Sequence, residues 1–194
     1  MAFTAPKRRI AQTPVARLAA RLALTLAAFA LVSPLGAQGT REYDPKAVFL
    51  FNFATFVEWP DEPAPVEGDS FVIGILGDDP FGPVLEQVIA GEAVKGMPLV
   101  VRRFQSIEEA KQARILYISV PAARLPEVVA GLRGLPILTV SDNPQFLAAG
   151  GIVGFSTGAR VELHINAEAA RRAKLTISSK LLRVAKLHAG GQAP

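Results

Sequence analysis

Four continuous apolar runs of strand length recur along the middle of the chain, and each is followed by a segment with helical periodicity. Uninterrupted apolar strands that alternate with helices are typical of a parallel sheet covered on both faces. The runs are residues 71–76, 98–104, 114–119 and 136–140, and the helical segments are residues 80–90, 106–112 and 122–131, with a helical turn at 144–148. Ser106 and Glu109 have the spacing of a capping box at the start of the second of these helices.

The pattern changes near the end of the chain. Residues 151–155 and 160–166 are predicted to be two strands joined by a tight turn, and the second strand alternates apolar and polar side chains. Antiparallel pairs of this kind commonly close the edge of a parallel sheet. Helices are expected at 167–173 and from about 178 to 187. The sequence thus predicts an α/β fold: a three-layer sandwich whose mostly parallel, five- to six-stranded sheet has a flavodoxin-like order, an antiparallel edge hairpin and a C-terminal helix.

The segment before the first strand is rich in aromatic residues. We expect a helix from about Asp44 to Glu58, with Asp44 as N-cap, Pro45 in the first turn and Pro60 as the stop signal. One arc of this helix, beginning at Phe49, has the i, i+4, i+7 spacing of a stripe that faces a core.

The opposite arc of the aromatic helix is also apolar. It carries Val48, Phe51 and Trp59, where a surface helix should be polar. The helix is therefore either buried on both sides or presents an aromatic patch to a partner. On the second alternative, Val48, Phe51 and Trp59 are candidate partner-binding residues.

The first 37 residues have the pattern of a cleaved signal peptide. Five basic residues precede an apolar run from Leu22 to Val32, and a small-residue context ends at Ala37, after which we expect cleavage. The apolar run is too short to span a bilayer, which needs about twenty residues. We therefore expect export to the periplasm, a single α/β domain over residues 38–188 and a frayed tail at 189–194.

Removal of the signal peptide changes the charge of the protein. The full chain has 21 basic and 17 acidic residues and a net charge of +4. All five basic residues of the signal leave and no acidic ones do, so the remaining chain is close to −1. A nucleic-acid partner inferred from overall basicity is thereby excluded. The chain has no cysteine, so disulfides, thiolate catalysis and cysteine-based metal sites are excluded as well.

One group of residues follows the predicted strand ends, where α/β folds bind ligands. The group comprises Gly77, Asp78, Asp79, Ser119, Ser141 and Asp142. The glycine spacing matches neither a dinucleotide-binding fingerprint nor a P-loop, and the two adjacent acids would repel a phosphate. The segment is either a turn with a helix cap or part of a crevice for a small cationic or amino ligand.

Catalytic and metal-binding constellations are not expected. The chain has two histidines, His164 and His188, and no G-x-S-x-G nucleophile elbow. Neither histidine has a second histidine or a carboxylate pair at metal-ligand spacing. We therefore expect no enzymatic activity, no metal and no cofactor.

A basic stripe marks the last predicted helix. Lys180, Arg183 and Lys186 recur at every third position, opposite apolar residues. They form a solvated outer face, or they bind an acidic protein partner or a membrane surface. We count them with the candidate partner-binding residues.

Several segments together, in order along the chain, resemble the YfiR family of periplasmic regulators. These segments are residues 46–60, 71–82, 96–103, 138–142, 146–151 and 165–182. The resemblance implies a repressor that binds the periplasmic region of an inner-membrane diguanylate cyclase, as the family's type member binds YfiN. It also implies an OmpA-like outer-membrane lipoprotein as a second partner that draws the repressor away. The type member carries disulfides that make it redox-sensitive; this chain has no cysteine, so that switch does not transfer. The oligomeric state stays open, with a homodimer among the alternatives.

Overall fold

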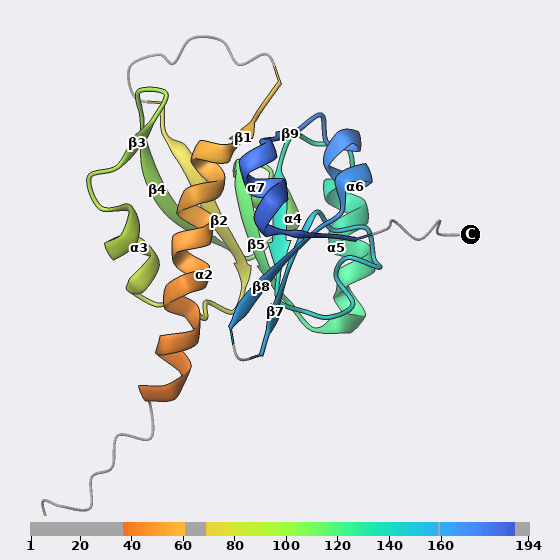
Figure 1. Cartoon of the computed structure of the whole chain (residues 1–194), viewed down its shortest axis with the longest axis horizontal. Helices are drawn as coiled ribbons and strands as arrows, with labels where there is room; N and C mark the ends of the chain where they lie inside the picture. The colour runs from red at the N-terminus through yellow and green to blue at the C-terminus, as the bar shows by residue number, and fades with distance from the viewer. Residues whose placement is uncertain (1–36, 61–68, 159, 189–194) are drawn as a thin grey trace, which may run out of the picture. The chain divides into compact units, whose positions relative to one another are not determined.

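A mixed sheet of eight strands runs through the protein (Figure 1). The computed structural model describes residues 37–60, 69–158 and 160–188, and the side chains from Pro45 onward with that of Thr157 excepted. The strands of the sheet are β2 (Phe71–Gly77), β3 (Ala93–Val94), β4 (Met97–Phe104), β5 (Ile115–Ser119), β6 (Leu138–Ser141), β7 (Val153–Thr157), β8 (Val161–Ile165) and β10 (Lys186–Leu187). A separate two-stranded sheet pairs β1 (Val57–Glu58) with β9 (Thr176–Ile177).

The strand order confirms the predicted flavodoxin-like arrangement. The strands lie in the order β10-β8-β7-β6-β5-β2-β4-β3, and the five from β7 to β4 are mutually parallel. Because the chain moves from β2 outward to β4 and then returns to β5 on the other side, the topological switch point lies between β2 and β5. The predicted hairpin is β7 and β8, which pair antiparallel. The sheet exceeds five or six strands because the two-residue strands β3 and β10 extend its edges.

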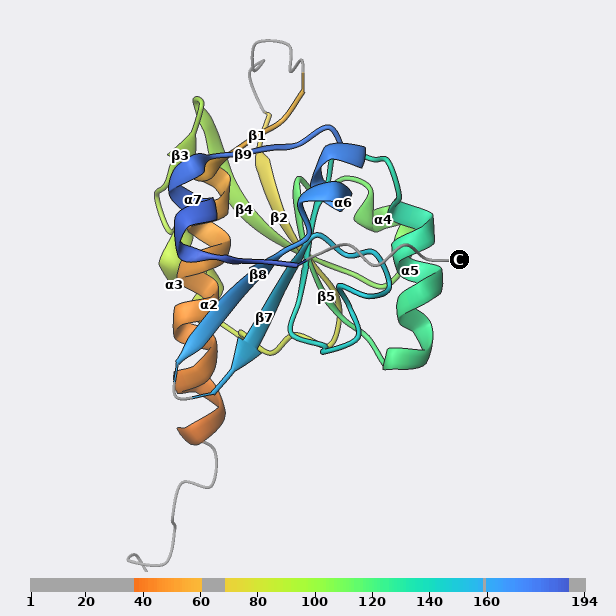
Figure 2. The ribbon, with the colours of Figure 1, turned by 45° about the vertical axis from the view of Figure 1, so that its right-hand side comes forward.

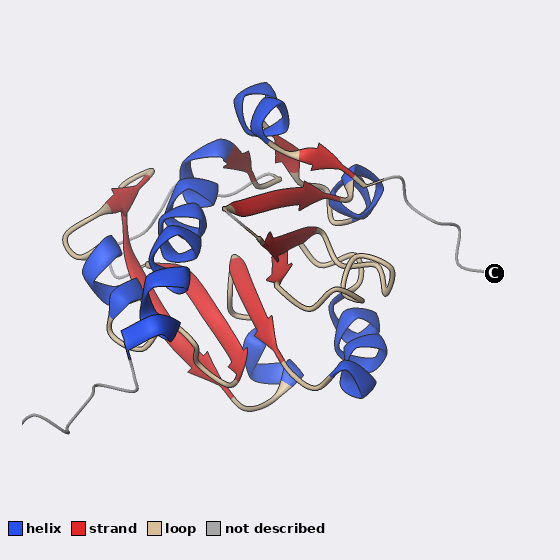
Figure 3. Ribbon diagram, turned by 60° about the horizontal axis from the view of Figure 1, so that its bottom comes forward, coloured by secondary structure: helices blue, strands red, loops and turns tan. Residues whose placement is uncertain are grey.

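Helices cover both faces of the sheet (Figure 3). They are α2 (Ala37–Phe56), α3 (Val84–Ile89), α4 (Ile107–Ala110), the 3-10 helix η1 (Ala122–Arg124), α5 (Leu125–Leu132), α6 (Ala167–Arg172) and α7 (Ser179–Val184). The buried residues of α2, α3, α6 and α7 belong to one core cluster, and those of α4 and α5 belong to a second cluster on the other face. The three-layer prediction is therefore confirmed.

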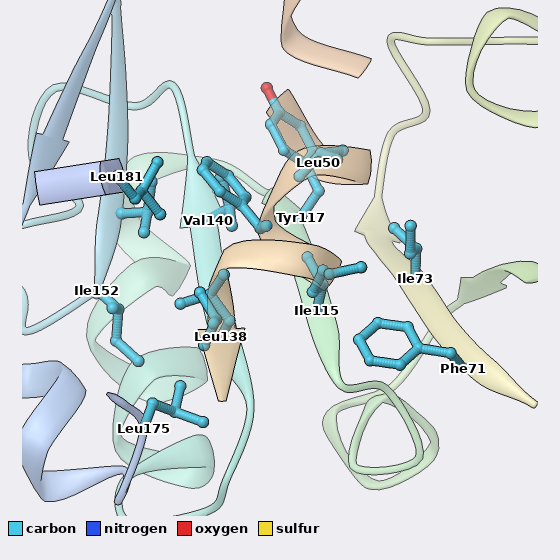
Figure 4. Packing of buried hydrophobic residues seen from close by; sticks show 14 of the residues in the cluster. Leu50, Phe71, Ile73, Ile115, Tyr117, Leu138, Val140, Ile152, Leu175 and Leu181 are labelled. Atoms are coloured by element: carbon cyan, nitrogen blue, oxygen red, sulfur yellow. The ribbon is translucent and has the colours of Figure 1, made fainter. Parts of the chain in front are cut away.

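The two core clusters follow the two-residue period of the strands. Along β2, Phe71 and Ile73 face the first cluster, in which Figure 4 shows them, while Val72 and Leu76 face the second. Gly74 faces the second cluster, where a Cβ atom would come within 2.7 Å of the Phe104 ring. The alternation explains why these strands appear in the sequence as continuous apolar runs.

The aromatic helix differs from its prediction at both ends. Helix α2 begins at Ala37 and continues through Pro45, so Asp44 is not its N-cap. It ends at Phe56, because Val57 and Glu58 pair with β9 and the Phe56 carbonyl accepts a hydrogen bond from the Ser178 amide. This pairing joins segments that are far apart in the chain and has no local signal in the sequence.

Other elements follow the predictions with shifted bounds. The capping box of α4 is present, with the Ser106 hydroxyl accepting from the Glu109 amide. The last predicted helix is shorter than expected, since α7 ends at Val184 and the chain then forms β10. The fold described here is that of the unit that begins at Gln38. The predicted signal peptide, apart from Ala37, and the predicted tail at 189–194 lie outside the described residues.

Candidate functional site

Helix α2 faces the core on one side and the outside on the other. Its inward side chains Ala47, Leu50 and Phe53 are fully buried, at the spacing of a single helical face. On the other side Val48 is 45 % exposed and Phe51 is half-buried against the core cluster. Two of the three residues of the predicted aromatic patch, Val48 and Phe51, therefore lie on the outer side of α2, where their apolar atoms are available for contact.

Trp59 does not belong to that outer side. The helix has ended before it, and its side chain is only 8 % exposed. The indole packs edge-on against Phe71, with ring centroids 5.2 Å apart and an interplanar angle of 87°. The helical extrapolation that placed Trp59 beside Val48 and Phe51 is wrong, because the chain becomes extended at Val57.

The strand-end residues predicted as a ligand crevice do meet at the switch point. Gly77 at the end of β2 lies opposite Ser119 at the end of β5, and the Asp78 amide donates to the Ser119 carbonyl at 3.0 Å. Gly77 has φ of +93°, and a Cβ atom there would stand 2.1 Å from the Ser119 oxygen. Glycine at this position is thus required by a close backbone contact.

Asp79 is engaged in local structure at the start of the α3 loop. One carboxylate oxygen accepts from the Phe81 and Gly82 amides, at 2.8 and 3.1 Å. The other accepts from Arg103 on β4, whose guanidinium also binds Glu86. The hydrogen bond to Glu86 raises the pKa of Arg103 above its usual range, and Asp79 acts in the same direction, against the effect of burial. This network braces the loop against the sheet.

Ser141, the last residue of β6, and Asp142, which follows it, lie at the same end of the sheet. The buried Ser141 hydroxyl donates to the Ile118 carbonyl at 2.7 Å and accepts from the Asn143 amide. Asp142 forms an ion pair with Lys46 of α2 at 2.9 Å, and the Lys46 side chain is completely buried. The structure therefore brings the predicted crevice residues together, and it uses most of their polar atoms to join neighbouring elements.

Lys46 is a residue that the sequence interpretation missed. A fully buried lysine needs a paired charge, because desolvation of an isolated ammonium is costly. The only signal in the sequence was a lysine on the inward arc of a helix otherwise lined by apolar residues. Lys46 and Asp142 together tie α2 to the carboxyl end of the sheet.

The cations predicted as partner contacts lie on α7 and β10. Lys180 and Arg183 are exposed, and neither forms an ion pair with a residue that the structure describes. Lys186 binds Glu162 of β8 at 2.6 Å, and this hydrogen bond is the main cause of a lowered pKa for Glu162. Helices α7 and α2 lie side by side (Figure 2), so the two groups of predicted contacts occupy neighbouring elements.

A hollow of about 360 Å³ lies at the opposite, amino-terminal end of the strands. It is lined by Trp59, Pro60, Ser70, Lys111, Gln112, Ala113, Arg114, Leu135, Pro136 and Ile137. The Arg114 guanidinium lies 5.5 Å above the Phe71 ring, and burial lowers the pKa of Arg114. The Trp59 Nε1 is buried with no acceptor among the described residues. This hollow was not predicted, since its lining comes from four separate stretches of the chain.

Within the described ranges, no cluster of three His, Asp or Glu side chains could hold a metal ion. The same residues include no helix long and apolar enough to cross a bilayer. His164 lies on β8, where its Nε2 is 3.0 Å from the Ser156 hydroxyl. His188 contributes its backbone amide to the pairing of β10 with β8.

A family model described as YfiR/HmsC-like matches residues 43–186. The chain belongs to the YfiR/HmsC-like family. The match begins within α2 and ends in β10, so it covers the described sheet except for Leu187. Membership of this family implies a YfiR-type regulator. No curated protein matches the chain.

Two solved structures are similar to the chain at low sequence identity. The first is the ABC domain in complex with L-Trp from Streptococcus pneumonia: the identity is 11 %, the TM-score is 0.47, and the match covers 73 % of this chain and 59 % of that one. The second is a conserved domain protein from Vibrio cholerae O1 biovar El Tor, with 13 % identity, a TM-score of 0.42, and coverage of 60 % and 54 %. The chain spans less than two thirds of the length of either.

Proposed function

We propose that the protein is an exported, non-enzymatic repressor that binds the periplasmic region of an inner-membrane diguanylate cyclase. Family membership and the expected signal peptide support this proposal. An OmpA-like outer-membrane lipoprotein is the second partner that the family resemblance implies. Both partners act from the periplasm, where the cleaved chain is expected to reside.

The outer side of α2 is the contact that we propose for the cyclase. Val48 is an exposed aliphatic residue in the middle of a long helix, and Phe51 lies one turn further on. Aromatic side chains at the centre of an interface often carry much of the binding free energy, so Phe51 is the expected anchor and Val48 the apolar contact beside it. The apolar pair of exposed Val48 and half-buried Phe51, one turn apart on the outer side of α2, is the observation on which this assignment depends, because the outer side of a solvent-facing helix should be polar.

The test is recovery of the receptor from solubilised membranes by the tagged protein, together with cellular cyclic-di-GMP. Val48→Asp should lower the affinity for the cyclase at least about 30-fold, corresponding to a hot-spot loss of about 2 kcal/mol, and should raise cyclic-di-GMP. Ala130→Asp, at an exposed position of α5 on the other face of the sheet, is the matched control and should leave both unchanged. If no membrane receptor is recovered and deletion of the gene leaves cyclic-di-GMP unaltered, the proposal is wrong.

The hollow beside Trp59 favours a second candidate function, the binding of a small ligand. The sequence placed such a ligand at the strand ends near Gly77 to Asp79, but the hollow lies at the other end of the sheet. Its described lining includes no acidic residue and contains Lys111, which is paired with Glu108, and Arg114, which lies over the Phe71 ring. An organic anion with an apolar body is the ligand class that it fits, in competition with Glu108 for Lys111.

Trp59 is the chain's sole tryptophan, so its fluorescence reports on the hollow directly. Titration with a panel of aromatic and aliphatic carboxylates should shift or quench the emission if the hollow binds one of them. The same ligand should raise the thermal midpoint by mass action. An unchanged spectrum and midpoint across the panel would count against this second function and leave the repressor proposal intact.

A further inference from the structure

The end of the chain carries exposed aliphatic side chains. Val184 at the end of α7 is 68 % exposed and Leu187 in β10 is 65 % exposed, which makes them the most exposed large hydrophobic residues that the structure describes. They are three positions apart, so their Cα atoms are separated by at most about 11 Å. Single exposed hydrophobic residues are ordinary, but these two stand together on one short segment.

The same segment is strongly basic. From residue 160 to residue 188 the chain has seven basic residues and two acidic ones, of which Glu168 pairs with Arg171 and Arg172. Lys180 and Arg183 project from α7 without an ion-pair partner in the described structure, and Lys186 has Glu162 beside it. Residues 38–159, by contrast, carry nine basic and fifteen acidic residues. The charge of the protein is thus divided between a basic C-terminal end and an acidic remainder.

We propose that this surface, defined by Lys180, Arg183, Val184, Lys186 and Leu187, binds the headgroup region of an anionic lipid bilayer. Aliphatic side chains that insert at the boundary of headgroups and acyl chains, flanked by lysine and arginine, are the combination that places a protein on a membrane surface. The long stems of Lys180 and Arg183 can lie along apolar surface while their charges reach the lipid phosphates. Each such cation near an anionic membrane contributes about 1 kcal/mol.

A lipid surface suits this segment better than an acidic protein patch. Protein interfaces concentrate their affinity in Trp, Tyr and Arg anchors that fill pockets, whereas Val184 and Leu187 are small aliphatic residues that protrude. The lipid assignment rests on the proposed function only for its setting, in which the repressor acts next to a membrane receptor. Lipid binding itself requires no receptor, so the two proposals can fail separately.

The test is co-sedimentation of the processed protein, with its N-terminus verified by mass spectrometry, with lipid vesicles. We expect binding to vesicles of equimolar phosphatidylcholine and phosphatidylglycerol, little binding to pure phosphatidylcholine, and loss of binding as salt rises. The double variant Lys180→Gln/Arg183→Gln should partition about 25-fold less, at roughly fivefold for each charge removed. The double variant Val184→Ser/Leu187→Ser should also bind more weakly.

Matched controls separate the site from net charge and from general hydrophobicity. Arg124→Gln/Arg133→Gln changes the net charge equally at exposed positions on the other face of the sheet, and Ala130→Ser replaces an exposed apolar side chain on that same face. Both controls should bind vesicles as the unmodified protein does. Because Lys180, Arg183, Val184 and Leu187 are exposed, unchanged thermal midpoints should accompany the losses.

Three results would overturn the proposal. The first is that the unmodified protein shows no preference for anionic vesicles, which would exclude a lipid surface as the partner. The second is that the Arg124→Gln/Arg133→Gln control loses as much vesicle binding as the α7 variant, which would show that net charge alone, and not this surface, determines the binding. Finally, the α7 variant could bind vesicles normally but fail to recover the receptor, and its cations would then belong to a protein interface.

Discussion

At the scale of single residues, the carboxyl end of the sheet is held by contacts that tolerate little change. Gly77 touches the Ser119 backbone, Ser141 bonds the Ile118 carbonyl, and Asp142 neutralises a fully buried Lys46. These contacts give the residues of the predicted ligand crevice a structural role.

Gly77→Ala should be strongly destabilising. Its φ of +93° already disfavours alanine, and the added Cβ would overlap the Ser119 carbonyl oxygen at 2.1 Å. We expect a loss of about 3 kcal/mol or more in the free energy of unfolding, since strain and steric overlap add. Gly91→Ala is the matched control, because Gly91 has φ of +76° but no atom within 4 Å of its Cβ position. Its cost should be only about 1 kcal/mol in urea unfolding; equal losses at the two positions would contradict the contact argument.

The Lys46–Asp142 pair should behave as a coupled unit. Asp142→Ala leaves the buried ammonium without this carboxylate and should cost roughly 3 kcal/mol, the lower end for a broken buried pair because Asp142 keeps some solvent contact. Lys46→Met should restore much of the loss in the Asp142→Ala background, since no buried charge then remains. Chemical denaturation of the two single variants and the double variant measures the coupling free energy. Additive losses would show that the pair contributes little.

At the scale of elements, long apolar runs were predictable and two-residue strands were not. Strands β2, β4, β5 and β6 appear within a few residues of their expected positions, because burial on both faces makes a continuous apolar run. The pairing of β1 with β9 depends on contacts between distant segments, which leave no local periodicity. The position of Trp59 was mispredicted for the same reason: it was placed on a helical surface and lies in the core. Its position depends on where α2 ends, and the pairing with β9 determines that end.

Strand β10 should loosen at acid pH. The Lys186 hydrogen bond lowers the pKa of Glu162 below its ordinary value of 4.5, and Arg160 and His164 act in the same direction. A carboxyl group with a depressed pKa adds stability that is complete above its unfolded-state pKa and is lost as pH falls through its folded-state pKa. The contact should therefore hold at neutral pH and weaken below about pH 4.5.

Hydrogen exchange of the His188 amide measures this change, because that amide donates to Ile165 across the edge of the sheet. Its protection should fall in acid in the unmodified protein. In Glu162→Gln the protection should already be low at neutral pH and should change less as the pH falls. A pH profile identical in the two proteins would mean that Glu162 does not hold β10.

At the scale of the whole molecule, stability comes from packing on two faces of one sheet. Two core clusters, one on each face, contain the buried hydrophobic residues, and no disulfide is present because the chain has no cysteine. The fold class was predictable, since alternating strands and helices allow few arrangements. The hollow beside Trp59 was not, because its lining is assembled from several strand ends and loops.

The absence of cysteine predicts that thiol chemistry leaves the protein unaffected. Its thermal midpoint should be the same in reductant and in oxidant, and the midpoint should not change when the protein is made in cells that lack periplasmic disulfide formation. A disulfide-bearing relative with the same fold, measured in parallel, should lose stability on reduction, by about 2–5 kcal/mol for a native disulfide. A shift of the midpoint with reductant in this chain would point to an effect outside the polypeptide.

The pairing of β1 with β9 also bears on how the chain becomes folded. Val57 bonds in register with Ile177, so the two partners are separated by most of the domain. Synthesis starts at the N-terminus, so the aromatic face of α2 is exposed long before β9 and α7 have been made and can fix the end of that helix. Contacts of such long sequence separation form late and slow the folding of a domain. We therefore expect the aromatic residues of α2 to stay exposed in the growing chain until β9 is available to pair with β1.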